Sequence, residues 1–248
     1  MTTPNQAAGA QQARAVGIFD RSEYVVAVVA MTIVVLLGFW PFYAALIRGG
    51  SGAHWIIYLH AAVYTGWLVL LLTQVLLVAR RRTQTHQRLG QYGAYYGVVV
   101  LLMGLVVTFA APALNVAAGR STVDEAASFL ILPLGDMLLF GAFFGAGIAT
   151  RRRPAIHRQW MILASTALIF PGAARFGDPY GLAVIVAIWL LPLGLLMTHE
   201  QVTRRRVGRV YLIGAAILLV ALARLGIMDS EAWRTIGRAL LEPFLRIT

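Results

Sequence analysis

The stretch WIIYLHAAVYTGWLVLLLTQVLLVA at residues 55–79, followed directly by Arg80, Arg81 and Arg82, decides the fold class. It contains no charged side chain, and it is longer than the roughly 20 residues that an α-helix needs to cross the hydrocarbon core of a bilayer. An arginine cluster at the end of such a stretch is typical of the cytoplasmic end of a membrane span. The sequence therefore predicts a membrane helix that ends in a basic loop.

The composition and six further apolar stretches extend this prediction to the rest of the chain. The protein has 248 residues, of which 59% are hydrophobic and 12% charged, whereas a soluble domain is roughly 45–50% apolar and 25% charged. Because lipid cannot satisfy open backbone groups, the spans are expected to be helices. We predict an all-α bundle of seven transmembrane helices within residues 24–226, after a mobile tail over 1–23. The predicted spans cover residues 24–47, 55–79, 92–114, 128–150, 159–174, 181–198 and 210–226.

The arginines are distributed unevenly over the loops between these spans. Alternate loops at one end hold twelve arginines, and the opposite loops hold three. The positive-inside rule places the arginine-rich loops in the cytoplasm, with the N-terminus inside and the C-terminus outside. The net charge of +11 therefore reflects topology and contact with the lipid bilayer, and nucleic acid is not expected as a partner. The arginine-rich loops contain the triplets Arg80, Arg81, Arg82, Arg151, Arg152, Arg153, Arg204, Arg205 and Arg206.

Two residue types are missing from the sequence, and each absence excludes certain cofactors. Because there is no cysteine, a thiolate-bound iron–sulfur cluster and covalent c-type haem are excluded. All 21 basic residues are arginine, so a retinal or pyridoxal cofactor, which needs a lysine Schiff base, is excluded as well. Haem b and a metal ion bound by histidine stay open.

The C-terminal segment 227–248 has the pattern of an amphipathic helix. Apolar side chains recur every three or four residues, and charged side chains occupy the other face. Such a helix is expected to lie on the outer membrane surface. The same pattern would suit contact with other membrane subunits through residues 229–247. The apolar positions are Trp233, Ile236, Leu240, Phe244 and Ile247.

Two of the arginine loops share a longer motif. Residues 80–86 and 151–157 both read Arg-Arg-Arg-x-x-x-His, and each copy joins the inner end of one predicted span to the start of the next. We interpret the chain as three helical hairpins with one helix in front of them, which makes the internal repeat parallel. The alternative is that short arginine-rich loops converged on one pattern.

Two polar residues lie inside predicted spans on the outer side. His60 is about 8 Å below Trp55 at a rise of 1.5 Å per residue, and Asp136 has a similar depth in its own span. Polar side chains at such positions mark functional sites by default. Tyr64 lies one turn below His60, and the long stem of Arg175 is expected to reach toward Asp136. These four residues are the candidate polar site, and the alternative is a structural Asp136–Arg175 pair that fixes helix packing.

Three further histidines lie at the inner ends of predicted spans. His86 and His157 stand at span starts, and His199 stands at a span end. At one depth on three helices, they are candidate ligands for haem b or a metal ion. The alternative is that His86 and His157 only pack at helix starts and fix the tight inner turns.

The inner-loop motifs resemble those of a known family. The stretches His86-Gln87-Arg88-Leu89-Gly90 and His157-Arg158-Gln159-Trp160-Met161, followed by Arg175, are similar to the His-Arg-x-x-Gly and His-Arg-x-Trp-Met motifs of bacterial multi-pass membrane proteins of unknown function. The resemblance covers roughly residues 55–176 and departs from the family at Gln87, where the family has arginine. It implies a histidine-containing helical bundle in the bacterial inner (cytoplasmic) membrane, and it implies no particular activity.

Three functions fit these features. The histidines and Asp136 favour a haem- or metal-binding redox protein of membrane electron transfer, linked to the quinone pool. The absence of hydrolase, nucleotide-binding and zinc-protease motifs, together with the C-terminal helix, suits a non-catalytic accessory subunit of a larger membrane complex. A small-solute or lipid transporter would have Asp136 and His60 in its path. We favour the first of these hypotheses.

Overall fold

The computed structural model describes residues 22–50 and 52–246, and every regular element within these ranges is a helix. Six helices are long and apolar enough to cross a membrane, and a bent pair at the N-terminal side can form a seventh span. The prediction of an all-α bundle is therefore confirmed, and the chain is a polytopic membrane protein. The predicted mobile tail lies outside the described residues except for its last two positions, which are helical.

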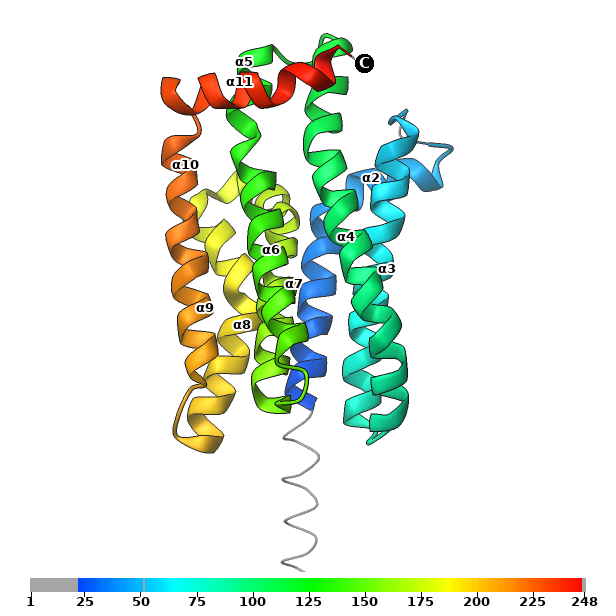
Figure 1. Ribbon diagram of the computed structural model, residues 1–248, viewed down its shortest axis with the longest axis vertical. Helices are drawn as coiled ribbons and strands as arrows, with labels where there is room; N and C mark the ends of the chain where they lie inside the picture. The colour runs from blue at the N-terminus through cyan, green and yellow to red at the C-terminus, as the bar shows by residue number, and fades with distance from the viewer. Residues whose placement is uncertain (1–21, 51, 247–248) are drawn as a thin grey trace, which may run out of the picture.

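The long helices run side by side, and one helix lies across their end (Figure 1). The elements are a first helix over Ser22–Gly38, α2 (Trp40–Ile47), α3 (Trp55–Ala79), α4 (Thr83–Ala117), α5 (Val123–Phe129), α6 (Ile131–Ala149), α7 (Pro154–Gly177), α8 (Leu182–Arg204), α9 (Arg209–Val220), α10 (Arg224–Ile227) and α11 (Glu231–Leu245), with 3-10 turns at Asp178–Tyr180 and Ala221–Ala223.

The predicted span 24–47 forms a bent pair of helices, because the chain turns by 65° between the first helix and α2. At the bend the backbone of the first helix meets that of α7. A Cβ atom on Gly38 would lie 2.1 Å from the carbonyl oxygen of Gly172, so only glycine allows this approach. Pro41 lies in the first turn of α2, where its missing N–H costs little. The break therefore combines a helix start with a close tertiary contact.

Helix α7 is the centre of the bundle. It packs against α6, α8 and α9, and it is the most buried of the six long helices. It is also the least apolar of them, because small and hydroxyl side chains such as Ala164, Ser165 and Thr166 face other helices and not lipid. The indole of Trp189 donates to the carbonyl oxygen of Thr166 at 2.7 Å, next to the helix turn that Pro171 disturbs. A buried hydrogen bond thus holds α8 on α7.

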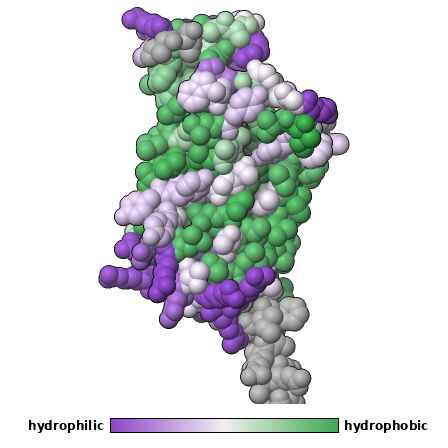
Figure 2. Space-filling view, turned by 90° about the vertical axis from the view of Figure 1, so that its right-hand side faces the viewer, coloured by the Kyte–Doolittle hydropathy of each residue, from purple (hydrophilic) through white to green (hydrophobic). Residues whose placement is uncertain are grey.

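The two ends of the bundle differ in charge. The turns between α3 and α4, α6 and α7, and α8 and α9 lie together at one end, which we call the arginine end because the three triplets lie in these turns (Figure 1). Figure 2 shows hydrophilic surface gathered there below a broad hydrophobic band. The opposite end, covered by α11, is called the α11 end. The segregation of arginine predicted from the loops is thus a property of the fold, and the orientation in the membrane stays a prediction.

Helix α11 lies across α5 and α4 (Figure 1). The Trp233 indole donates to the carbonyl oxygen of Ala127 at 3.0 Å, Leu241 is fully buried, and the ring of Phe244 stacks on Phe109 at 4.7 Å. The predicted amphipathic helix therefore exists, and much of its apolar face is covered by the protein itself.

Replacing Gly237 with leucine is expected to lift α11 from α5. A Cβ at this position would lie 2.6 Å from the backbone oxygen of Ala127, which cannot move independently of α5. Crowding of this kind costs about 1–3 kcal/mol, so trypsin should cleave after Arg234 and Arg238 about tenfold faster than in the wild type. Limited proteolysis followed by mass spectrometry measures this. Gly226→Leu is the control, because a Cβ at Gly226 has nothing within 4 Å, and cleavage as fast as in Gly237→Leu would contradict the prediction.

Candidate functional site

A buried ion pair joins α6 and α10 near the α11 end. The Arg224 guanidinium donates to Asp136 Oδ1 at 2.5 Å and to the carbonyl oxygen of Leu132 at 3.0 Å. Only 4% of the Asp136 side chain and 7% of the Arg224 side chain are exposed. Gly135 makes room for this arginine, since a Cβ there would lie 2.3 Å from Arg224 Nη1. Two opposite charges are thereby held and neutralised inside the bundle.

The predicted pairing of Asp136 with Arg175 is wrong. The Arg175 guanidinium donates to the carbonyl oxygen of Pro171 in its own helix at 3.1 Å and lies over the Phe39 ring at 4.5 Å. It therefore covers the bend between the first helix and α2. Arg175 is therefore not part of the buried ion pair.

His60 and Tyr64 form the other part of the site. Their rings stack at a centroid distance of 4.1 Å on successive turns of α3. The Tyr64 hydroxyl donates to the carbonyl oxygen of Val100 and lies 3.3 Å from Met137 Sδ, next in sequence to Asp136. His60 Nδ1 is buried and has no hydrogen-bond partner among the described residues. A buried polar atom without a partner is uncommon and requires an explanation.

These contacts define a polar group that extends across three helices. We call it the α11-end polar group, and its members are His60, Tyr64, Asp136 and Arg224. The sequence pointed to the first three by their depth, whereas Arg224 was missed because it stands at the last turn of the last apolar stretch, where arginines commonly reach the membrane surface. The small neighbour Gly135 is the one local signal of a bulky partner for Asp136.

The three inner histidines do not form the predicted metal site. Among the described residues, no three histidine, aspartate or glutamate side chains lie together as metal ligands. His157 Nδ1 lies 2.7 Å from the carbonyl oxygen of Gly147, and His199 Nδ1 lies 3.9 Å from Glu23 in the first helix. His86 and His157 are each the fourth residue of their helices. Gln74, with its amide nitrogen turned to His86, donates to the backbone oxygen of that residue at 3.2 Å.

A second buried polar cluster at the arginine end was not predicted. Glu200, 4% exposed, accepts hydrogen bonds from the Gly208 backbone N–H at 2.8 Å and from Arg204 at 3.4 Å. The hydroxyl groups of Tyr24 and Tyr211 lie 3.5 Å apart nearby. Glu200 thereby fixes the turn from α8 to α9. The sequence could have indicated Glu200, because it is the one acidic residue between Asp178 and Asp229.

The α11-end polar group therefore carries the chemistry of the candidate site, and the clusters at the arginine end hold helices and turns together. Comparison of the chain with protein-family models, with curated proteins and with solved structures gives no match.

Proposed function

We propose that this protein takes part in membrane electron transfer linked to the quinone pool, and that the α11-end polar group binds the head group of the quinone. The buried, unpaired Nδ1 atom of His60 carries this proposal. A quinone combines carbonyl oxygens, which accept hydrogen bonds, with an apolar tail, and therefore suits a histidine inside a membrane span. The Asp136–Arg224 ion pair adds two buried ionised groups at the same end of the bundle, on α6 and α10.

Access to His60 is compatible with a ligand that arrives from the lipid. The apolar stretch of α3 is the least buried among the six long helices. Leu59, the neighbour of His60, is 43% exposed, and His60 itself is partly exposed. Tyr64 covers one side of the imidazole and is in turn fixed by its contacts to Val100 and Met137. The imidazole is thus held in position and is partly exposed, and binding at its buried Nδ1 atom requires a small movement of the surrounding side chains.

Haem b and a metal ion fit the described residues less well than a quinone. A metal ion is usually held by three or four side chains, and no such set is present among the described residues. A bis-histidine haem at the α11 end would need a second histidine opposite His60. His54 is on the same helix and caps its start by accepting from the Ile56 N–H at 3.4 Å.

The two other functions have less support from the contacts of the described residues. The amphipathic C-terminal helix packs on α5 and α4, so its pattern no longer points to a separate subunit. A transport path past Asp136 would have to pass Trp67, Phe140 and Phe144, whose rings pack against each other at 5.4–5.7 Å below the site. Neither function has an observation of its own among the described residues.

Quinone binding by the full chain tests the proposal. The protein is purified from its native membrane, its extracted lipids are examined for quinone, and binding of a short-chain quinone is followed by tryptophan fluorescence. Loss of a hydrogen bond to a buried group costs about 1–3 kcal/mol, so His60→Phe, which keeps a ring against Tyr64, should weaken binding about 10- to 100-fold.

His54→Asn is the matched control, because it changes an exposed histidine of the same helix and keeps a residue that caps helix starts. It should bind the quinone as the wild type does. Equal affinity of the wild type and His60→Phe would contradict the role of His60. A haem absorption band in the purified protein would replace the quinone with haem as the bound redox group.

A further inference from the structure

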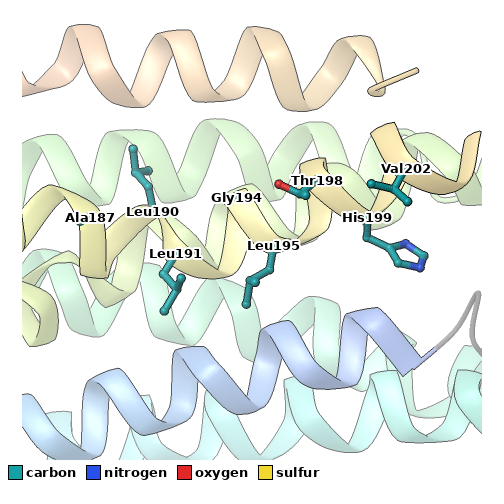
Figure 3. Close-up of a pocket in the computed structure, with 8 residues that line it drawn as sticks. All are labelled: Ala187, Leu190, Leu191, Gly194, Leu195, Thr198, His199 and Val202. Atoms are coloured by element: carbon teal, nitrogen blue, oxygen red, sulfur yellow. The ribbon is translucent and has the colours of Figure 1, made fainter. Parts of the chain in front are cut away.

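A shallow and open apolar groove, lined by residues of α8 alone, runs along one face of this helix. Its lining residues follow one another at helical spacing from Ala187 to Val202, a length of roughly 22 Å at 1.5 Å per residue. The groove is open at Gly194, since a Cβ at this position would have nothing within 4 Å. Figure 3 shows the side chains of Leu191, Leu195 and His199 pointing to the same side of α8, toward the first helix.

The groove opens toward the third arginine triplet. His199 lies at this end, and α8 ends five residues later at Arg204. The next residues, Arg205 and Arg206, are exposed, as is Arg209 at the start of α9. None of these three exposed arginines forms a salt bridge with any residue of the described chain. Arg204, by contrast, is paired with Glu200. Unpaired positive charge therefore lies beside an apolar groove, at the level where lipid head groups are expected.

We propose that the α8 groove binds an anionic phospholipid, with an acyl chain along α8 and the phosphate at Arg205 and Arg206. A roughly 22 Å groove accommodates one acyl chain, because one leaflet fills only half of the roughly 30 Å hydrocarbon core, about 15 Å. Basic sites between membrane helices on the cytoplasmic side recognise anionic head groups through charge. Neither the acyl-chain contact along α8 nor the phosphate contact at the arginines depends on the proposed quinone site, which lies near the other end of the bundle.

The choice of this triplet follows from the groove. The triplets at Arg80 and Arg151 carry the same charge at the same end of the bundle, and all their members are exposed. The groove lined by α8, however, runs toward the turn between α8 and α9. The three arginine triplets should therefore contribute unequally to the binding of an anionic phospholipid, although their sequences are alike.

Native mass spectrometry of the full chain tests this inference. The delipidated protein is titrated with phosphatidylglycerol and, in a second series, with phosphatidylethanolamine that has the same acyl chains. A basic residue near the surface contributes about fivefold to binding of an anionic lipid. The double variant Arg205→Gln with Arg206→Gln should therefore bind phosphatidylglycerol about 30-fold more weakly, whereas Arg151→Gln with Arg152→Gln removes the same charge and should change affinity less than threefold.

The apolar part of the site is tested separately. Gly194→Leu should fill the groove and weaken binding at least fivefold, whereas Gly145→Leu, also at a position with open space, should not. Equal loss in both arginine variants, or equal binding of the two lipids, would overturn the inference. It would also be overturned if Gly194→Leu left lipid binding intact or abolished a dimer of the chain, because the groove would then hold another occupant.

Discussion

Replacing Arg224 with leucine is expected to lower the free energy of unfolding by about 3–5 kcal/mol. The change removes the partner of Asp136 and leaves a carboxylate that is 4% exposed without its counter-charge. It also removes the hydrogen bond to Leu132 and the contact with the Phe170 ring at 5.1 Å. Thermal unfolding in one detergent, followed by circular dichroism and by the fraction that remains monodisperse, measures the loss.

The double variant Asp136→Leu with Arg224→Leu should recover most of this stability. Removing both charges leaves no uncompensated group, and a buried ion pair replaced by apolar side chains is commonly neutral or stabilising. A double variant as unstable as Arg224→Leu would show that the loss came from packing and not from charge. A stable double variant also gives a folded protein in which the role of the ion pair in quinone binding can be measured.

Arg246→Leu is a suitable control for the effect of burial. Arg246 and Glu242 are also 2.5 Å apart, yet their side chains are 75% and 60% exposed. Pairs of this kind on a helix contribute about 0.3–0.5 kcal/mol, so the change should be small. The two arginines have the same distance to their partners and differ in burial. A comparable loss in both variants would contradict the argument that burial sets the effect.

The sequence predicted how deep each residue lies in the membrane better than it predicted which neighbouring helix the residue faces. The stretch 55–79 coincides with α3, and the stretch 210–226 lies within the last span, Arg209–Ile227. Depth along a helix follows from residue number, and this placed His60 and Asp136 in the same half. The rotation of each helix depends on its neighbours. Arg175 and Arg224 both stand near the α11 end, and only the packing decides which one faces Asp136.

Contacts between segments that are distant in the sequence explain what else the sequence could not predict. The periodicity of 229–247 predicts an amphipathic helix, but the surface that covers it is formed by α5 and α4, more than a hundred residues earlier. The predicted grouping of the three histidines is wrong because His199 lies beside Glu23 of the first helix, whereas the contact of His157 with Gly147 is local and spans the turn between α6 and α7. Whether the two Arg-Arg-Arg-x-x-x-His motifs arose by duplication stays a prediction.

The break in the first span leads to the second large effect: Gly38→Leu is expected to destabilise the protein by about 3 kcal/mol, at the upper end of the usual cost of overpacking. The three atoms nearest to a Cβ at Gly38 all belong to the backbone of Gly172, at 2.1–2.7 Å. Backbone inside α7 cannot rotate away as a side chain can, so the first helix must move outward. This movement would loosen the buried contacts of Ala27, Met31 and Val34 with the rest of the core.

Two further variants separate crowding from a general effect of leucine in a membrane helix. One changes Gly172, which Gly38 contacts, and the other changes Gly145, which has open space around it. Gly172→Leu should destabilise less than Gly38→Leu, because the nearest atom to its Cβ, the Val35 Cα, lies at 3.1 Å. Gly145→Leu in α6 meets nothing within 4 Å and should be nearly neutral. Unfolding by denaturant in mixed micelles gives this order, and equal stabilities of the three variants would contradict a close contact between the first helix and α7. If the order holds, the bend at Gly38 is fixed by helix packing, because Gly38 and Gly172 are both buried and differ in how closely a Cβ would approach the neighbouring helix.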